Sequence, residues 1–286
     1  MNFLFHFVIT MKKQLNLKQS DYIASGATGS IYRLDSYNGI HRVIKLAKSN
    51  EVASILRNEA AIYQIMNNSC KYVPRFYEAG MYYNNLTDET VFGIVIEYIN
   101  HDNLVTNMKY ITSKNINKIF TNILKILECF HNHNFVVKDV KPDNFLYDPD
   151  TNRVWMVDLG LVGYCPFKWT ECKNFTGTLR YISNRCHDHV NTYYDDIESS
   201  IYTVIFCYYG YLPWKIVKLP EWSDIDYRNR IKNIKESGKF NTMVDMFPSI
   251  AKIYYSVHSD DDSENDNTNQ SLCKKPDYST FWEILN

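Results

Sequence analysis

The stretch of residues 136–144 constrains this chain more than any other part of its sequence. It contains Asp139, Lys141 and Asn144, and another aspartate, Asp158, follows the next apolar run. A carboxylate can orient a hydroxyl group, and a fixed ammonium group can neutralise a phosphate. An amide and a second carboxylate can together hold a magnesium ion. These four side chains, in this order, therefore predict a site for phosphoryl transfer.

Composition narrows the classes of protein to consider. The chain has 286 residues, of which 45% are hydrophobic and 22% charged, which suits one globular domain or two lobes sharing an interface. The formal net charge of -1 gives no basic field for nucleic acid. No apolar stretch is as long as a membrane-spanning helix requires. We therefore expect a monomeric intracellular protein, in the cytoplasm, the nucleus or both, with no direct nucleic-acid site and no membrane contact.

Residues 18–47 predict three strands and two turns. A turn with Gly26 and Gly29 separates the first two strands, and Asn38–Gly39 is a strong signal for a hairpin turn before the last strand. Glycines let backbone N–H groups approach phosphate groups closely. Two glycines at this spacing, taken alone, fit an ordinary tight hairpin better than a phosphate-binding loop.

A lysine on the last of these strands and a glutamate on the next helix form a second candidate pair. Apolar residues recur with helical period over residues 51–67, and Glu59 lies in the middle of that segment, 14 residues after Lys45. Lys45 could instead extend its ammonium group to solvent. Spacing alone also leaves open whether the partner of Lys45 is Glu59 or Glu51. The phosphoryl-transfer residues downstream favour nucleotide contact for Lys45.

The second half of the chain is predicted to be mainly helical. An apolar strand over residues 91–99 runs into the polar segment 100–103, where we place a boundary between two lobes. Helices are expected at residues 113–131, with Ser113 as N-cap, and then at 195–209, 224–236, 241–257 (interrupted by Pro248) and 276–286. His131 and His133 are expected at the surface. Residues 259–271 are rich in Asp, Asn and Ser and predict a disordered loop.

The order of these features resembles that of eukaryotic-type protein kinases. A glycine turn, a strand lysine, a helix glutamate, an Asp-x-Lys-x-x-Asn segment and an Asp-Leu-Gly segment follow one another along the chain. More narrowly, the chain is similar to the casein kinase I and vaccinia-related kinase branch, which includes virus-encoded members. The stretches that carry this narrower resemblance are residues 23–32, 158–161, 164–166, 177–183, 195–199, 212–214 and 275–278.

The resemblance implies a bilobal α+β fold, in which a small β-sheet lobe carries one main helix and a larger lobe is helical. The expected division is an N-terminal extension over residues 1–19, an N-lobe over 20–99 and a C-lobe over 100–286. The implied activity is that of a serine/threonine kinase, which transfers the γ-phosphate of ATP to protein hydroxyl groups with the help of Mg²⁺. For a virus-encoded member, the intracellular location is the host cell.

The resemblance also implies a role for each residue that matches a family motif. In the stretch 136–144, called the catalytic loop below, the catalytic residues are the base Asp139 and the γ-phosphate contact Lys141. The magnesium ligands are Asn144 and Asp158, and the supporting residues are Thr178, for the substrate hydroxyl, and Asp196, for the catalytic-loop backbone. The ATP-binding residues are Ala24, Gly26, Gly29, Ile31, Lys45, Glu59, the gatekeeper Ile96, and Glu97 and Ile99 of the hinge. An apolar spine links the lobes through Tyr63, Val137 and Leu159.

Some positions depart from the family pattern. Lys138 replaces an arginine, and because a lysine cannot form a bidentate fork with a phosphate, control by activation-loop phosphorylation is not expected. Ala24 replaces the first glycine of the turn. Tyr193 and Tyr194 stand where casein kinase I has two arginines, which argues against recognition of substrates that are already phosphorylated.

Two other functions remain open at this point. A pseudokinase, which is a binding or scaffold module on the same fold, is disfavoured because Lys45, Asp139, Lys141, Asn144 and Asp158 are all retained. A small-molecule kinase of the aminoglycoside or choline type shares the Asp-x-x-x-x-Asn spacing. That class lacks Lys141 in combination with the Gly177-Thr178 and Leu212-Pro213-Trp214 elements, so it is also disfavoured.

Overall fold

The computed structural model describes residues 13–49, 51–165, 176–188, 191–259 and 274–286. Within these residues the chain forms two compact units. The first contains the residues up to Asn100 together with Met156–Gly160, and the second contains His101–Trp155 and the residues from Leu161 onward. The division after Asn100 lies one residue beyond the predicted lobe boundary. The sequence does not predict that residues 156–160 belong to the first unit.

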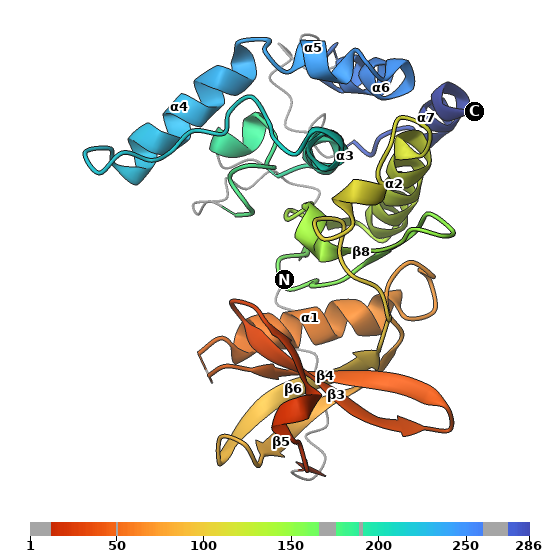
Figure 1. Ribbon diagram of the computed structural model, residues 1–286, viewed down its shortest axis with the longest axis vertical. Coiled ribbons are helices and arrows are strands. Elements are labelled where there is room, and N and C mark those ends of the chain that lie inside the picture. The colour runs from red at the N-terminus through yellow and green to blue at the C-terminus, as the bar shows by residue number, and fades with distance from the viewer. Residues whose placement is uncertain (1–12, 50, 166–175, 189–190, 260–273) are drawn as a thin grey trace. The chain divides into compact units, whose positions relative to one another are not determined.

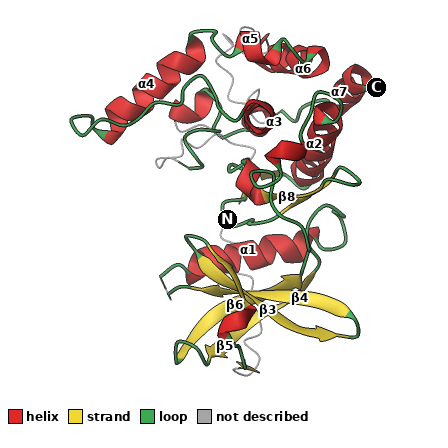
Figure 2. Cartoon of the chain, in the orientation of Figure 1, coloured by secondary structure: helices red, strands yellow, loops and turns green. Residues whose placement is uncertain are grey.

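A six-stranded mixed sheet forms the body of the first unit (Figures 1 and 2). In the order β1-β5-β6-β4-β3-β2, its strands are Lys13–Gln14, Phe76–Asn84, Glu89–Glu97, Ile40–Ala47, Gly29–Tyr37 and Tyr22–Ser25. Neighbouring strands are antiparallel except for β1, which pairs parallel with β5. The strand β5 is not predicted from the sequence, because most of its side chains are half-buried instead of alternating between buried and exposed.

The first described residues are part of this sheet. The strand β1 pairs with β5 at Tyr82 and Tyr83, and Leu15 and Leu17 are buried in a core cluster with residues of the sheet. Residues 13–17 of the predicted extension thus take part in the sheet, while residues 1–12 lie outside the described part. The alternation of leucines with polar residues is a strand pattern that the prediction overlooks.

The helix α1, Ala53–Met66, lies along one face of the sheet (Figure 2). Its buried side includes Leu56, Ala60 and Tyr63. Glu59 lies on this same side and is 1% exposed. Because an unpaired carboxylate is costly to bury, a glutamate at this position requires a partner.

Helices α2 to α7 dominate the second unit. They span Ile116–Asn132, Tyr193–Tyr209, Asp224–Glu236, Asn241–Val244, Pro248–Ser259 and Tyr278–Leu285. The helix α3 is buried along nearly its whole length and packs against α2 and α6 (Figure 1). The prediction of a buried helix at residues 195–209 is confirmed, with a start two residues earlier.

Two short strand pairs flank the catalytic loop. The strand β7, Phe135–Val136, pairs antiparallel with β10, Gly163–Tyr164, and β8, Phe145–Asp148, pairs with β9, Arg153–Met156. A 3-10 turn at Pro142–Asn144 joins the catalytic loop to β8. Both ends of the loop are therefore fixed by strands.

Two predicted helix boundaries can be compared with the structure. The helix α2 has Asn115 as its N-cap, two residues after the predicted Ser113, because the Asn115 side chain accepts a hydrogen bond from the Thr112 N–H (2.7 Å) and closes a turn. The predicted interruption at Pro248 is confirmed, since this proline is the first residue of α6. A proline is tolerated there because the first turn of a helix does not use its N–H groups.

In the part of the chain that the structure describes, no helix has the length and apolar character needed to cross a membrane. The predicted disordered loop at residues 259–271 lies outside the described residues from position 260 onward. Its first residue, Ser259, ends α6.

Replacing Leu17 by alanine tests whether residues 13–17 belong to the first unit. The Leu17 side chain is 4% exposed, so its truncation leaves a cavity and is expected to lower the free energy of unfolding by about 2–5 kcal/mol. The matched control is Leu86→Ala, because Leu86 lies between β5 and β6 and is 37% exposed. Denaturant unfolding measures both variants. Equal effects of the two substitutions would show that residues 13–17 are not part of the folded unit.

Candidate active site

In the first unit, Lys45 on β4 lies between two carboxylates. Its Nζ atom is 2.8 Å from Oε2 of Glu59 on α1 and 2.9 Å from Oδ1 of Asp158, in the segment after β9. Lys45 and Glu59 are buried, whereas the side chain of Asp158 is 48% exposed. Three residues predicted to bind nucleotide or metal therefore meet at one point.

The two carboxylates control the charge of Lys45. Burial alone would lower the pKa of its ammonium group, but the attraction of Glu59 and Asp158 outweighs burial and raises that pKa. Burial raises the pKa of Glu59, and the Lys45 ammonium counteracts this rise. A protonated lysine whose second partner is half-exposed is suited to contact an incoming phosphate group.

The structure decides between the alternatives left open for Lys45. Glu51 is exposed in the turn before α1, so Glu59 is the glutamate that pairs with Lys45. Because the lysine is buried, it does not extend its ammonium group to solvent. The helix α1 also holds the segment that carries Asp158, since the Asn58 side chain donates to the Gly160 carbonyl (3.2 Å).

The turn at Gly26 and Gly29 has the compact backbone that the sequence predicts. The Gly26 N–H donates to the Gly29 carbonyl (2.9 Å) between the antiparallel strands β2 and β3. A Cβ atom at Gly29 would lie 2.6 Å from the Leu46 carbonyl oxygen, so strand packing requires glycine there. Gly26 has open space around its Cα and is exposed. Of the two other residues predicted at this turn, Ala24 ends near it on β2 and Ile31 lies on β3.

The predicted hinge is the continuation of β6. Ile96, the predicted gatekeeper, is buried in the sheet. The Glu97 N–H donates to the Arg75 carbonyl (2.8 Å), and its side chain accepts the Arg75 N–H (3.1 Å). Within the described residues of this unit, the Ile99 N–H has no hydrogen-bond acceptor. Ile99 therefore has a backbone donor available for the edge of an adenine ring.

In the second unit, three side chains hold the carboxylate of Asp139. Thr178 Oγ1 donates to its Oδ1 atom (2.7 Å), Lys141 Nζ pairs with Oδ2 (2.6 Å), and Asn144 Nδ2 donates to the same oxygen (3.2 Å). Lys141 also donates to Thr178 Oγ1 (3.2 Å). All the phosphoryl-transfer residues predicted in this unit therefore lie within hydrogen-bonding distance of Asp139.

The backbone before Asp139 is held in a left-handed conformation by Asp196. Lys138 has a φ angle of 69°, in a region that few non-glycine residues adopt. The Asp196 carboxylate accepts the Val137 N–H (2.7 Å) and the Lys138 N–H (2.9 Å). Such a conformation costs roughly 1–3 kcal/mol and persists only where the surroundings fix it. Asp196 lies where it can fix this backbone, which is the supporting position that the sequence predicts.

His131 is a buried part of the same network, so the prediction of a surface residue is wrong. Its ring is fully buried, and its Nε2 atom lies 3.0 Å from Oδ2 of Asp196. A signal for this burial exists in the sequence, because His131 follows Leu124 by seven residues and Leu127 by four and so falls on the apolar stripe of α2. His133, the C-cap of α2, is partly exposed.

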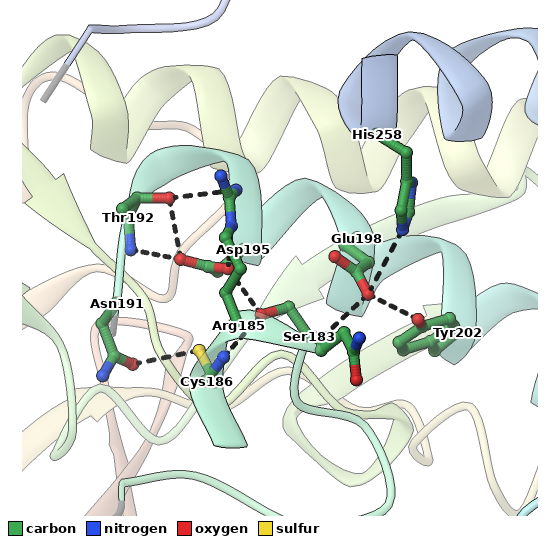
Figure 3. Close-up of polar contacts among 10 residues, drawn as sticks. Ser183, Arg185, Cys186, Asn191, Thr192, Asp195, Glu198, Tyr202 and His258 are labelled. Carbon is green, nitrogen blue, oxygen red and sulfur yellow. Dashed lines mark hydrogen bonds and ion pairs between the residues drawn. The ribbon is translucent and has the colours of Figure 1, made fainter. Parts of the chain in front are cut away.

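A cluster around Asp195 ties the segment after Thr178 to the start of α3 (Figure 3). The Asp195 carboxylate accepts the Ser183 hydroxyl and the Thr192 N–H (2.6 Å), and Arg185 Nε lies 3.3 Å from it. Asp195 is itself buried. The sequence identifies the motif at this position but not the role of this carboxylate.

Glu198 forms a second part of this cluster, one helical turn further along α3 (Figure 3). Its Oε1 atom accepts the Asn184 N–H (2.9 Å) and the Tyr202 hydroxyl, and His258 Nε2 on α6 lies 3.7 Å away. Asp195 and Glu198 thus fix neighbouring residues of one segment. The segment in turn leads back to Thr178, the residue that contacts Asp139.

The two predicted magnesium ligands present the oxygen donors that this ion prefers. Asn144 directs its amide nitrogen to Asp139, which leaves its carbonyl oxygen unused by these contacts. Asp158 uses Oδ1 for Lys45 and has a half-exposed side chain. Among the described residues there is no group of three or more His, Cys, Asp and Glu side chains that could hold a metal ion. Magnesium sites for nucleotides commonly use one or two carboxylates together with the phosphates, so each of these two side chains, within its own unit, offers a donor of the kind that such an ion accepts.

The structure brings the predicted residues together in two groups. The first unit assembles Lys45, Glu59 and Asp158. The second assembles Asp139, Lys141, Asn144 and Thr178, with Asp196 on the backbone beside them. The predicted spine residues Tyr63, Val137 and Leu159 are each buried.

A six-stranded sheet with one helix, a helical unit and these two groups of charged side chains define the class of protein. The family model for the protein kinase domain matches residues 17–275, so the chain belongs to the protein kinase family. Its relatives place it more narrowly, as a serine/threonine kinase of the casein kinase I branch.

Three relatives support this narrower placement. The chain is 30% identical over 235 residues to a probable casein kinase I homolog of Encephalitozoon cuniculi, and the match covers 78% of this chain and 75% of that protein. Casein kinase I homologs 1 and 2 of Saccharomyces cerevisiae are each 24% identical over 239 residues, which cover 77% of this chain and 43% of theirs. The chain therefore spans less than half the length of the yeast relatives.

Glu198 should make the stability of the protein depend on pH. Burial alone would raise the pKa of this carboxyl group. The hydrogen bond and positive charge of His258, together with the hydrogen bonds from the Tyr202 hydroxyl and the Asn184 N–H, outweigh burial and lower the pKa from its ordinary value of 4.5 to about 2. A carboxyl group with a lowered pKa stabilises the folded state above its ordinary pKa. The contribution is lost as the pH falls from 4.5 towards 2.

We expect Glu198→Gln to lower the free energy of unfolding at pH 7 by on the order of 3 kcal/mol. Its difference from the wild type should shrink between pH 4.5 and pH 2, because the wild-type carboxylate is protonated in that range. Urea unfolding at a series of pH values measures this difference. The matched control is Glu221→Gln, since Glu221 is exposed. A constant difference between Glu198→Gln and the wild type at all pH values would contradict the prediction.

Proposed function

We propose that this kinase transfers the γ-phosphate of ATP to serine and threonine hydroxyl groups of proteins, with Mg²⁺ as its cofactor. The observation that carries the proposal is the set of contacts around Asp139. A carboxylate has about four lone-pair sites, and three of those of Asp139 are used by Thr178, Lys141 and Asn144. Among the contacts of the described residues, one acceptor site is left, with its direction fixed, for the hydroxyl group of a substrate.

Each residue around Asp139 has a distinct part in the proposed reaction. Asp139 accepts the hydrogen bond of the substrate hydroxyl and takes its proton as the oxygen attacks the γ-phosphorus. The bond from this phosphorus to the oxygen that bridges to the β-phosphate breaks, and ADP leaves. Thr178 keeps the carboxylate in the orientation that directs its remaining lone pair to the hydroxyl. The Lys141 ammonium lies between Asp139 and Thr178 and neutralises negative charge on the transferring phosphoryl group.

The nucleotide is proposed to bind to the first unit. The exposed backbone around Gly26 would cover the phosphates, Lys45 would contact the α- and β-phosphates, and Ile99 would bind the adenine edge. The buried pair with Glu59 fixes the position of the Lys45 ammonium before ATP arrives. Mg²⁺, held by Asn144 and Asp158, would neutralise charge on the phosphate oxygens.

The pseudokinase alternative has less support. A scaffold module has no need for a buried lysine between two carboxylates or for an aspartate held by three donors. The small-molecule kinase alternative lacks support from the motifs at residues 177–178 and 212–214. The names of the relatives favour protein acceptors, of which casein is a practical test substrate.

Other expectations from the sequence remain part of the proposal. They are a monomeric state, an intracellular location in the cytoplasm, the nucleus or both, and the absence of a direct nucleic-acid site. The net charge of -1 motivates the last of these. Light scattering that shows a dimer would refute the monomeric state. Salt-sensitive binding to DNA or RNA would refute the absence of a direct nucleic-acid site.

The replacement Asp139→Asn tests the proposed chemistry. Asparagine keeps the size of the side chain but is a much weaker proton acceptor, so we expect transfer of labelled phosphate from ATP to casein to fall by about 10²–10⁴-fold. Phosphoamino-acid analysis of the wild-type product should show phosphoserine and phosphothreonine. Removal of Mg²⁺ with a chelator should abolish the transfer.

The control for this experiment is Asp150→Asn, because Asp150 is an exposed residue between β8 and β9. It should retain the wild-type rate. If the wild type transfers no more phosphate than Asp139→Asn while still binding ATP, the pseudokinase alternative is correct. Transfer to small hydroxylated acceptors but not to proteins would instead support the small-molecule kinase.

A further inference from the structure

A chain of hydrogen-bonded side chains joins the last helix to the catalytic loop. The hydroxyl of Tyr278, the first residue of α7, lies 2.8 Å from Nδ1 of His131 on α2, and Nε2 of His131 lies 3.0 Å from Oδ2 of Asp196 on α3. The same Asp196 oxygen accepts the Val137 N–H, and the other accepts the Lys138 N–H. The C-terminal helix is therefore connected to the two residues that precede Asp139.

For a neutral His131, the chemistry of the three groups fixes the direction of this chain of hydrogen bonds. A carboxylate only accepts hydrogen bonds, so the Nε2 atom of His131 carries the proton that is donated to Asp196. In a neutral imidazole the Nδ1 atom is then an acceptor, and the Tyr278 hydroxyl is its donor. Burial raises the pKa of the Tyr278 hydroxyl, which keeps its proton on the oxygen. Tyr278 thus favours the tautomer of His131 that can donate to Asp196.

Water is a poor substitute for the tyrosine at this position. The exposed fraction of His131 is 0% and that of Tyr278 is 6%. The ring of Tyr193 packs against His131 with 4.8 Å between the ring centroids. Without the Tyr278 hydroxyl, Nδ1 would be a buried acceptor that has lost its donor, and the imidazole could turn or change tautomer.

Other contacts fix the start of α7 independently of the Tyr278 hydroxyl. Asp277 caps the helix by accepting the Ser279 N–H (3.0 Å), and Lys275 Nζ donates to the Asn132 carbonyl at the end of α2 (3.3 Å). Phe281, one turn further on, packs edge-on against the Tyr278 ring. Removal of one hydroxyl group should therefore leave α7 folded.

The geometry points to Tyr278 as a positioning residue for the catalytic loop. It acts through His131, whose hydrogen bond orients the Asp196 carboxylate that holds Lys138 in its left-handed conformation. Asp139 follows Lys138 directly, so the direction of its carboxylate depends on this backbone. The expected effect of Tyr278 on kcat rests on the proposed kinase function. Its expected effect on the backbone of the catalytic loop does not.

The variant Tyr278→Phe tests this role, because it removes the hydroxyl and keeps the ring. We expect kcat to fall about three- to ten-fold, as for the loss of one buried hydrogen bond, with an unchanged KM for ATP. Amide hydrogen exchange at Val137 and Lys138 should be faster by a similar factor, while the amides of α7 keep their wild-type protection. The control is Tyr227→Phe, which loses a hydroxyl bonded to the Ile216 carbonyl (3.1 Å) and should behave as wild type.

A double-mutant cycle shows whether Tyr278 acts through His131. In the background of His131→Phe, which removes both ring nitrogens, the further change Tyr278→Phe should have no effect on kcat. Additive effects of the two changes would overturn the inference. If His131→Phe does not fold, the exchange rates of Tyr278→Phe decide alone.

Two results of the exchange experiment would overturn the inference. One is wild-type exchange at Val137 and Lys138 in Tyr278→Phe. The other is faster exchange throughout α7, which would mean that the hydroxyl only stabilises the helix. If the wild-type protein transfers no phosphate, the proposed function fails, and the exchange experiment still tests the connection from Tyr278 to the catalytic loop.

Discussion

The catalytic loop depends on one carboxylate, that of Asp196. It accepts two adjacent backbone N–H groups and so holds Lys138 at a φ angle of 69°. Left-handed backbone at a residue other than glycine costs about 1–3 kcal/mol, and two hydrogen bonds to a charged group, each contributing about 1.5–3 kcal/mol, can offset that cost. Because Asp139 comes next in the chain, the carboxylate of Asp196 also sets the direction of the proposed catalytic base. The helix α3 is buried so that this carboxylate cannot turn to solvent.

Both units place charged groups inside the protein and give each of them several partners. Lys45 contacts two carboxylates in the first unit. In the second, Asp195, Asp196 and Glu198 lie close together near the start of α3, and each accepts hydrogen bonds from the segment that it holds. An unpaired charge would be costly at these positions, whereas a paired one keeps a fixed direction. Charged groups fixed before the substrate binds need no rearrangement at the moment of phosphoryl transfer.

The sequence predicts those parts of the site that depend on short spacing or on a family motif. Asp139, Lys141 and Asn144 are found because six residues contain them all, and Glu59 is found because the family motif pairs a helix glutamate with the strand lysine Lys45. The strand β5 is missed because most of its side chains are half-buried and show no alternation, whereas the burial of Leu17 is missed although the alternation of leucines with polar residues signals a strand there. The contact between His131 and Tyr278 joins residues 147 positions apart, and no local pattern predicts it. Ser113 is a reasonable N-cap by residue type, but the turn closed by Asn115 moves the start of α2.

If Asp196 positions Asp139, the replacement Asp196→Asn must slow phosphoryl transfer without weakening the binding of ATP. The Val137 and Lys138 N–H groups bond to different oxygens of Asp196, and asparagine replaces one of these oxygens with an NH₂ group that cannot accept, so the left-handed backbone loses part of its support. Single-turnover transfer of labelled phosphate from ATP measures the chemical step, and calorimetry measures the Kd for ATP separately. We expect the rate to fall on the order of 100-fold, as for a misplaced catalytic group, with an unchanged Kd. A wild-type rate, or a loss of ATP affinity as large as the loss of rate, would contradict the role of Asp196.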